Sequence, residues 1–278
     1  MGDRAPITER GAEGRVTAYG DRAVAQGDTA ARPPAAAISV PSTLPVGTGS
    51  SPTSPAIATV MIYDPQSRLK GRTATAILTN LERDLNAIRY PGKPPDFLLT
   101  QFGLRFEARH LSRMSTADER YNTARLDFPL YILNADTNDA TSAKQIRELM
   151  LDHGIRDAGV AREQFEAAES GWTDRNVEGL GIQPLDGFKK VAFVKGDNVT
   201  KVAKDVEAGF TNVIKHELGH MFNIKMHSSS GVMRSGVQLA AGLLDYTDSN
   251  RATILTTLAT LKMLSEAELL RRYLRQNP

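Results

Sequence analysis

The segment HELGHMFNIKMHSSSGVM, residues 216–233, holds three of the five histidines in this chain of 278 residues. His216 and His220 are four residues apart, so they share one face if the segment is helical. Apolar residues recur at helical spacing upstream of them. We therefore predict a helix over residues 205–222. Asn223 is the expected stop, because asparagine tolerates the left-handed conformation that ends many helices.

Two imidazoles on one helix face suit a tetrahedral zinc ion, which binds histidine nitrogen at about 2.0–2.1 Å. Glu217 lies about 100° further round the helix. It cannot bind a metal through the same face, but it can reach a metal-bound water as a general base. A third ligand must come from outside the helix. His227 is the nearest candidate, because a chain that turns back after the helix can present it to the metal.

Acidic residues further along the chain are alternatives for the third ligand. A glutamate on a later helix, Glu266 or Glu268, could take the place of His227, and Asp245 is a weaker candidate. Tyr246 could lean into the site and stabilise an oxyanion, or it could be an ordinary, partly buried loop residue.

The segment resembles the signature of the metzincin metallopeptidases, and of their archaemetzincin-like branch most of all. That signature is H-E-x-x-H-x-x-G-x-x-H followed by a turn that bears methionine, and HELGHMFNIKMH and GVM are similar to it. The resemblance implies that His216, His220 and His227 bind Zn²⁺, that Glu217 is the general base, and that Met233 is the Met-turn residue beneath the metal. It also implies an α+β fold, with a twisted mixed β-sheet, an active-site helix and C-terminal helices.

The chain departs from this signature at three points. Asn223 stands where the family has glycine, and one extra residue separates His220 from His227. The cysteines that archaemetzincins carry after the third histidine are absent, and Ser228 begins the corresponding stretch.

Composition excludes several classes of function. The absence of cysteine excludes disulfides, thiolate metal sites and a cysteine nucleophile. The net charge of +2 comes from well-mixed charges, so we expect no nucleic-acid partner. No apolar run is long enough for a membrane span, and the N-terminus lacks a secretory signal. We therefore expect the chain to be made in the cytoplasm, with non-classical export still open.

The sequence divides into two parts. Residues 1–56 are rich in Pro, Ala, Ser and Thr, with short β-prone pieces between Gly-Asp turns. They are typical of a flexible or partly β N-terminal segment and linker, which could bind a partner. Residues 57–278 form the expected metzincin-like zinc metallopeptidase domain. His110 and His153, which are remote from the motif, are expected to be ordinary surface or core histidines.

Local patterns predict the elements of the larger part. The predicted strands are 58–65, 95–102, 104–111, 127–136 and 189–197, and the predicted helices are 73–90, 142–170 in two pieces, 205–222, 250–263 and 265–274. Ser265 and Glu268 form an expected capping box for the last helix. Residues 169–187 are expected to form a glycine-rich loop. This order indicates one α+β catalytic domain.

We expect a zinc-dependent endopeptidase that hydrolyses peptide bonds of a protein or peptide substrate through a metal-activated water, with Glu217 as general base. The substrate would lie extended along an edge strand, either 127–136 or 189–197. One alternative is a narrow-specificity protease effector or toxin that its N-terminal segment targets. Another is a catalytically inactive zinc-binding protein, although a purely structural site has no use for Glu217.

Overall fold

The computed structural model describes residues 19–20, 55–89, 91–92, 103–134, 140–155, 172, 179–182 and 189–276, with the backbone alone described at 19–20, 140–142 and 266–276. The predicted strand 95–102 and the second piece of the predicted helix 142–170 lie outside these residues. So does most of the N-terminal segment 1–56.

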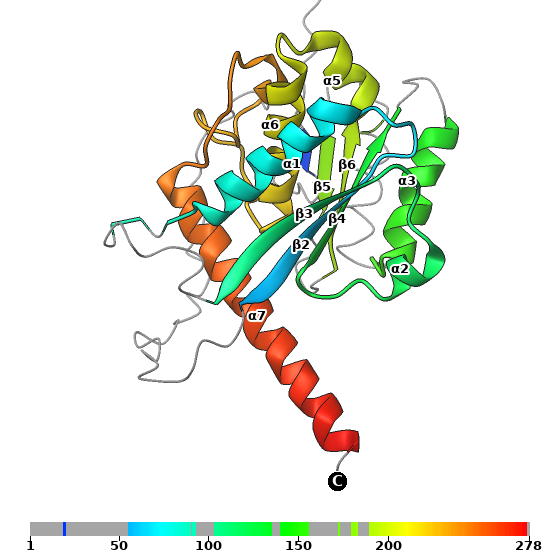
Figure 1. Cartoon of the computed structure of the whole chain (residues 1–278), viewed down its shortest axis with the longest axis vertical. Helices are drawn as coiled ribbons and strands as arrows, with labels where there is room; N and C mark the ends of the chain where they lie inside the picture. The colour runs from blue at the N-terminus through cyan, green and yellow to red at the C-terminus, as the bar shows by residue number, and fades with distance from the viewer. Residues whose placement is uncertain are drawn as a thin grey trace, which may run out of the picture.

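The described residues form a mixed β-sheet with helices on both of its faces (Figure 1). The strands are β1 (Tyr19–Gly20), β2 (Ala56–Tyr63), β3 (Leu104–Leu111), β4 (Asp127–Leu133), β5 (Gly179–Ile182) and β6 (Val191–Lys195). The helices are α1 (Gly71–Asn86), α2 (Ala117–Tyr121), α3 (Ala140–Asp152), α5 (Gly196–Val202), α6 (Val206–Met221) and α7 (Asp248–Gln276), with a 3₁₀ turn η2 (Val237–Leu239).

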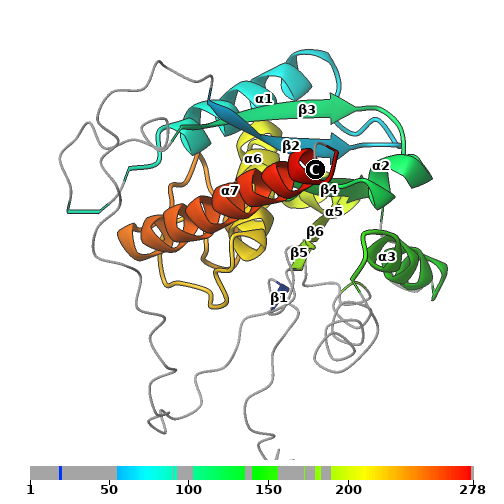
Figure 2. The same cartoon turned by 90° about the horizontal axis from the view of Figure 1, so that it is seen from below.

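The sheet has the strand order β1-β5-β6-β4-β2-β3. Strands β3, β2, β4 and β6 are parallel, whereas β5 is antiparallel to β6 and β1 is antiparallel to β5. Parallel neighbours need crossover connections, and α1 supplies the one between β2 and β3. Figure 2 shows β5 and β1 at one side of the sheet and β3 at the other. The predicted α+β class and mixed sheet are confirmed at this level.

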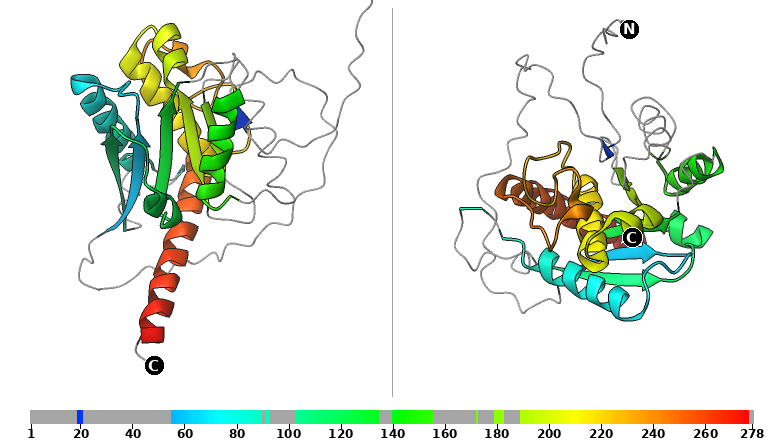
Figure 3. Two further views of the ribbon diagram at one scale, coloured as in Figure 1. Left: turned by 90° about the vertical axis from the view of Figure 1, so that its right-hand side faces the viewer. Right: turned by 90° about the horizontal axis from the view of Figure 1, so that it is seen from above.

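Alternating side chains of the strands build two hydrophobic cores, one on each face of the sheet. In β4, Phe128 and Leu130 join a core that α1, α6 and α7 cover, whereas Tyr131 and Leu133 join a second core with α3 and Trp172. Figure 3 shows α1 and α3 on opposite sides of the sheet. The candidate site belongs to the first face, because α6 lies there.

Several local predictions were wrong. The two strands expected to offer an edge to the substrate, 127–136 and 189–197, are β4 and β6, and each has a neighbouring strand on both sides. The C-terminal helices 250–263 and 265–274 are one helix, α7, which contains Ser265 and Glu268 within it. No glycine or proline interrupts α7, so the capping-box pattern has no helix start to stabilise.

None of the helices in the described part of the chain is both long and apolar enough to cross a membrane.

The predicted glycine-rich loop 169–187 contains strand β5, with the sequence GLGI. Only two of its four residues carry side chains, so the sequence gives little strand signal. The predicted strand 189–197 also ends earlier than expected, because the chain enters helix α5 at Gly196. Strand β3, by contrast, has the predicted bounds, Leu104–Leu111.

Candidate metal centre

Helix α6 carries three of the candidate site residues and is held firmly at its start. Asp205 is the N-cap, and its carboxylate accepts hydrogen bonds from the backbone N–H groups of Glu207 and Ala208. Every residue from 208 to 221 is buried, so this helix is surrounded by other elements over most of its length. His216, Glu217 and His220 therefore have fixed backbone positions.

Helix α6 ends as the sequence predicts. Asn223 adopts the left-handed conformation, with φ +69°. The N–H of Ile224 bonds to the carbonyl of Gly219 at 3.0 Å, and the N–H of Asn223 bonds to that of His220 at 2.9 Å. This pair of bonds is a Schellman motif, which reverses the chain directly after the helix.

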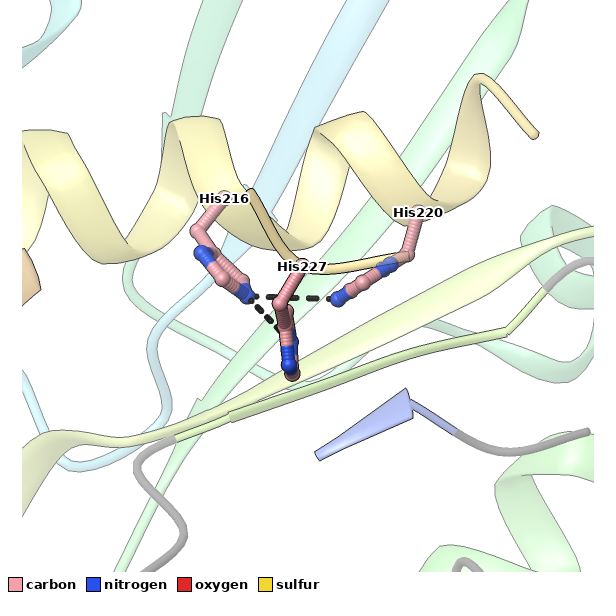
Figure 4. A group of neighbouring side chains, drawn as sticks. All are labelled: His216, His220 and His227. Carbon is pink, nitrogen blue, oxygen red and sulfur yellow. Dashed lines mark hydrogen bonds between the residues drawn. The ribbon is translucent and has the colours of Figure 1, made fainter. Parts of the chain in front are cut away.

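The reversed chain brings the third histidine to the other two (Figure 4). One nitrogen from each of His216, His220 and His227 lies within 4.8 Å of the others. The Nε2 of His216 is 3.2 Å from the Nε2 of His227 and 3.2 Å from the Nε2 of His220. Met226 is 78% exposed, so the extra residue before His227 is accommodated by a loop that bulges into solvent.

Backbone carbonyls fix the tautomers of the two helical histidines. Nδ1 of His216 is 2.8 Å from the carbonyl oxygen of Val232, and Nδ1 of His220 is 2.8 Å from that of Ile224. A carbonyl oxygen only accepts, so each Nδ1 carries the proton and each Nε2 of the neutral ring presents a lone pair. Burial, the largest effect, and then the proximity of His216 hold the pKa of His220 well below its usual range, which keeps this ring neutral.

Lone pairs that converge in this way suit a cation. Two neutral imidazoles with Nε2 lone pairs 3.2 Å apart repel one another unless a positive charge lies between them. Three nitrogens bound tetrahedrally to one zinc ion at the usual bond length would be about 3.3 Å apart. The separations of His216 Nε2 from the other two nitrogens therefore fit a zinc ion. So do the tautomers of His216 and His220, because a carbonyl group holds each of their Nδ1–H groups.

Glu217 projects from α6 toward strand β5 and is fully buried. A methyl group added to Gly179 would lie 2.7 Å from the carboxyl carbon of Glu217, and one added to Gly181 would lie 2.7 Å from Cβ of His220. These two glycines share the face of β5 that meets α6, whereas Leu180 points into the second core. The alternation of glycine in GLGI is compatible with a close approach of helix and strand, but it is a weak strand signal by itself, and the segment was predicted to be a loop.

Met233 lies against α6 at Gly219. In the sequence, Gly219 stands between His216 and His220. A methyl group on Gly219 would lie 2.9 Å from Cε of Met233 and closer still to its sulfur. The backbone of this segment is fixed as well, because Ser228 N–H bonds to the carbonyl of Met233 at 2.9 Å. The neighbouring Val232 supplies the carbonyl that orients His216.

The alternative site residues lie elsewhere or are engaged otherwise. The side chain of Asp245 is 77% exposed and lies 3.7 Å from the ammonium group of Lys215. The buried hydroxyl of Tyr246 donates a short hydrogen bond to the carbonyl of Lys215, so it is already used to hold the helix. The side chains of Glu266 and Glu268 lie outside the described residues.

The other two histidines are remote from the cluster. His110 of β3 lies 3.1 Å from the buried carboxylate of Asp64. His153 follows α3 and is buried between Tyr131 and Thr123. Both have the structural surroundings expected for ordinary histidines.

Comparison of the chain with protein-family models, with curated proteins and with solved structures finds no match.

Proposed function

We propose that the chain is a zinc-dependent endopeptidase of the metzincin type. The observation that carries this proposal is the convergence of three imidazole Nε2 atoms, two of them from one helix turn, beside a buried glutamate on the same helix. Met233 beneath that helix and the mixed sheet are consistent with the resemblance that the sequence motif suggests. His216, His220 and His227 would hold the metal.

Zinc bound by three neutral histidines would keep its double positive charge and an open position, which supplies a Lewis acid for water and for a peptide carbonyl. Glu217 would be the general base, because its carboxylate is on the same helix, α6, as His216 and His220 but not on the face that the two histidines share. It would accept a proton from the attacking water and deliver it to the leaving amine. The close approach of Gly179 leaves that carboxylate little freedom to move.

The ligand set is tested by metal content. Protein purified without added metal should contain close to one zinc per chain by elemental analysis, and His227→Ala should lose most of it. His110→Ala is the matched control, because that histidine lies outside the cluster, and it should retain zinc. If His227→Ala keeps its zinc while Glu266→Ala or Glu268→Ala loses it, the proposed ligand set is wrong.

Catalysis is tested separately at Glu217. Glu217→Gln should retain zinc and the wild-type circular dichroism spectrum but lose cleavage of a peptide library by about 10²–10⁴-fold, the usual contribution of a general base. Equal rates in wild type and Glu217→Gln, with zinc bound in both, would instead identify a catalytically inactive zinc-binding protein.

A further inference from the structure

One edge of strand β5 is covered by a short strand from the N-terminal segment 1–56, which is called the head below. Its inner edge pairs with β6, with Gly179 opposite Val194. Its outer edge pairs with β1, which is antiparallel to it, with Tyr19 opposite Gly181 and Gly20 opposite Leu180. A segment that lies about 160 residues earlier in the sequence, by the difference between Tyr19 and Gly179, thus completes this side of the sheet.

The same short strand borders the histidine cluster. Gly179 lies against the carboxyl group of Glu217, and Gly181 lies against Cβ of His220. Figure 4 shows β1 beside β5, near the three histidine rings, and Figure 2 shows the same neighbourhood from another side. An extended chain that pairs with the outer edge of β5 therefore lies next to the candidate metal centre.

Main-chain hydrogen bonds supply the affinity when a strand adds to a sheet edge, and they are open to any extended chain of suitable shape. A pairing of two residues makes few such bonds, so it is reversible. Covalent attachment compensates, because it makes the pairing intramolecular and so raises the effective concentration of the segment. A bare edge is also a site of unwanted association, so covering it has a use in itself.

We propose that the outer edge of β5 is a docking site for an extended chain segment and that the protein's own head, at Tyr19–Gly20, is its built-in, displaceable occupant. It follows that the head competes with a peptide substrate that approaches the metal centre along β5. The competition rests on the proposed peptidase function, whereas the docking does not.

The docking is tested in the full chain by hydrogen exchange. Tyr19→Pro/Gly20→Pro removes both backbone N–H groups of β1 and prevents the pairing whichever of them faces β5. The β5 amides that point away from β6 should lose protection in this variant. They should remain protected in Ala36→Pro/Ala37→Pro, a control with two prolines elsewhere in the head. Equal exchange at β5 in all three proteins would overturn the docking.

A second measurement uses a fluorescein-labelled peptide with the sequence of residues 14–28. It should bind the Tyr19→Pro/Gly20→Pro variant at least about tenfold more tightly than the wild type, because the tethered head no longer occupies the edge. Equal affinity for the two proteins would count against the docking. Cleavage of the peptide library should also be faster in this variant than in the wild type and the control.

The outcomes separate the two proposals. If exchange and peptide binding behave as expected but cleavage is measurable and unchanged, the competition is wrong and the peptidase function stands. If zinc is bound but no variant cleaves, the peptidase function fails and the competition with it, while the docking is supported by exchange and binding.

Discussion

Three glycines determine how closely the candidate metal centre is assembled. Gly219 lets Met233 approach helix α6, and Gly179 and Gly181 let strand β5 approach the same helix. At each of these positions a methyl group would lie within 3.0 Å of a neighbouring atom, which real structures do not tolerate without movement. These residues are therefore positioning residues for the cluster, although none carries chemistry of its own.

Gly219→Ala should destabilise the protein and weaken zinc binding. Alanine would stabilise an isolated helix by about 1 kcal/mol, but here its methyl group meets Met233. Urea unfolding and zinc affinity measure the two effects. Gly242→Ala is the control, because a methyl group there meets nothing within 4 Å. Adding Met233→Ala to Gly219→Ala should recover part of the loss, and strict additivity of the two single effects would argue against the contact.

At the scale of elements, a buried ion pair joins α6 to α1. The ammonium group of Lys215, whose side chain is 1% exposed, lies 2.6 Å from the carboxylate of Asp84. The same ammonium group donates to the carbonyl of Leu244 at 2.5 Å, and Tyr246 holds the carbonyl of Lys215. The residue just before His216 therefore ties α6 to α1 and to the loop that precedes α7.

Asp84→Asn should lower the free energy of unfolding by about 3 kcal/mol, because it leaves a buried ammonium group without its main counter-charge. Arg83→Ala is the matched control. Arg83 is the other ion-pair partner of Asp84, and the side chain of Arg83 is 57% exposed. Its removal should therefore lower the free energy of unfolding by less than about 1 kcal/mol. The double change Asp84→Leu/Lys215→Met should recover much of the loss. A loss in Asp84→Asn no larger than in the control would contradict this account.

At the scale of the whole molecule, the two faces of the sheet have different characters. Helix α6 covers one face, while the other contains a buried polar network. The hydroxyl of Tyr131 is 2.7 Å from Nε2 of His153 and 2.6 Å from Oγ of Ser115. Thr123 lies 3.1 Å from Nδ1 of the same histidine. Burial, helped by the charges of Arg120, Lys189 and Lys190, lowers the pKa of His153 to about 3.

This depressed pKa predicts how stability depends on pH. In the unfolded chain His153 takes up a proton near its ordinary pKa of about 6.5, whereas the folded protein resists protonation until about pH 3. The unfolded state binds more protons between these values. The stability associated with the neutral, buried His153 is therefore fully present above about pH 6.5. As the pH falls toward 3, the free energy of unfolding decreases by up to about 1.4 kcal/mol per pH unit.

Urea unfolding at pH 7 and pH 4.5 measures this contribution. Wild type should lose about 2 kcal/mol more than His153→Gln between the two pH values. Tyr131→Phe is the control, because it removes a hydrogen bond but keeps the buried imidazole, so its pH dependence should follow that of wild type. An identical pH dependence in wild type and His153→Gln would rule out this origin.

The sequence determined those features of the fold that depend on neighbouring residues. The apolar spacing, with Asn223 as the stop, predicted α6 to within one residue at each end, because helices depend on bonds between residues four apart and on their caps. The run LRFEARHL predicted β3 in full. The spacing of His216 and His220 likewise placed two imidazoles on one face without reference to the rest of the chain.

The tertiary structure decided what depends on distant residues. Nothing local shows that GLGI is a strand, because its glycines are explained only by the helix that packs against them. The approach of His227 despite an extra residue depends on a bulge at Met226, and the pairing of Tyr19 with Gly181 joins segments about 160 residues apart in the sequence. Such contacts are stabilised by packing and hydrogen bonds between elements, which no short stretch of sequence contains.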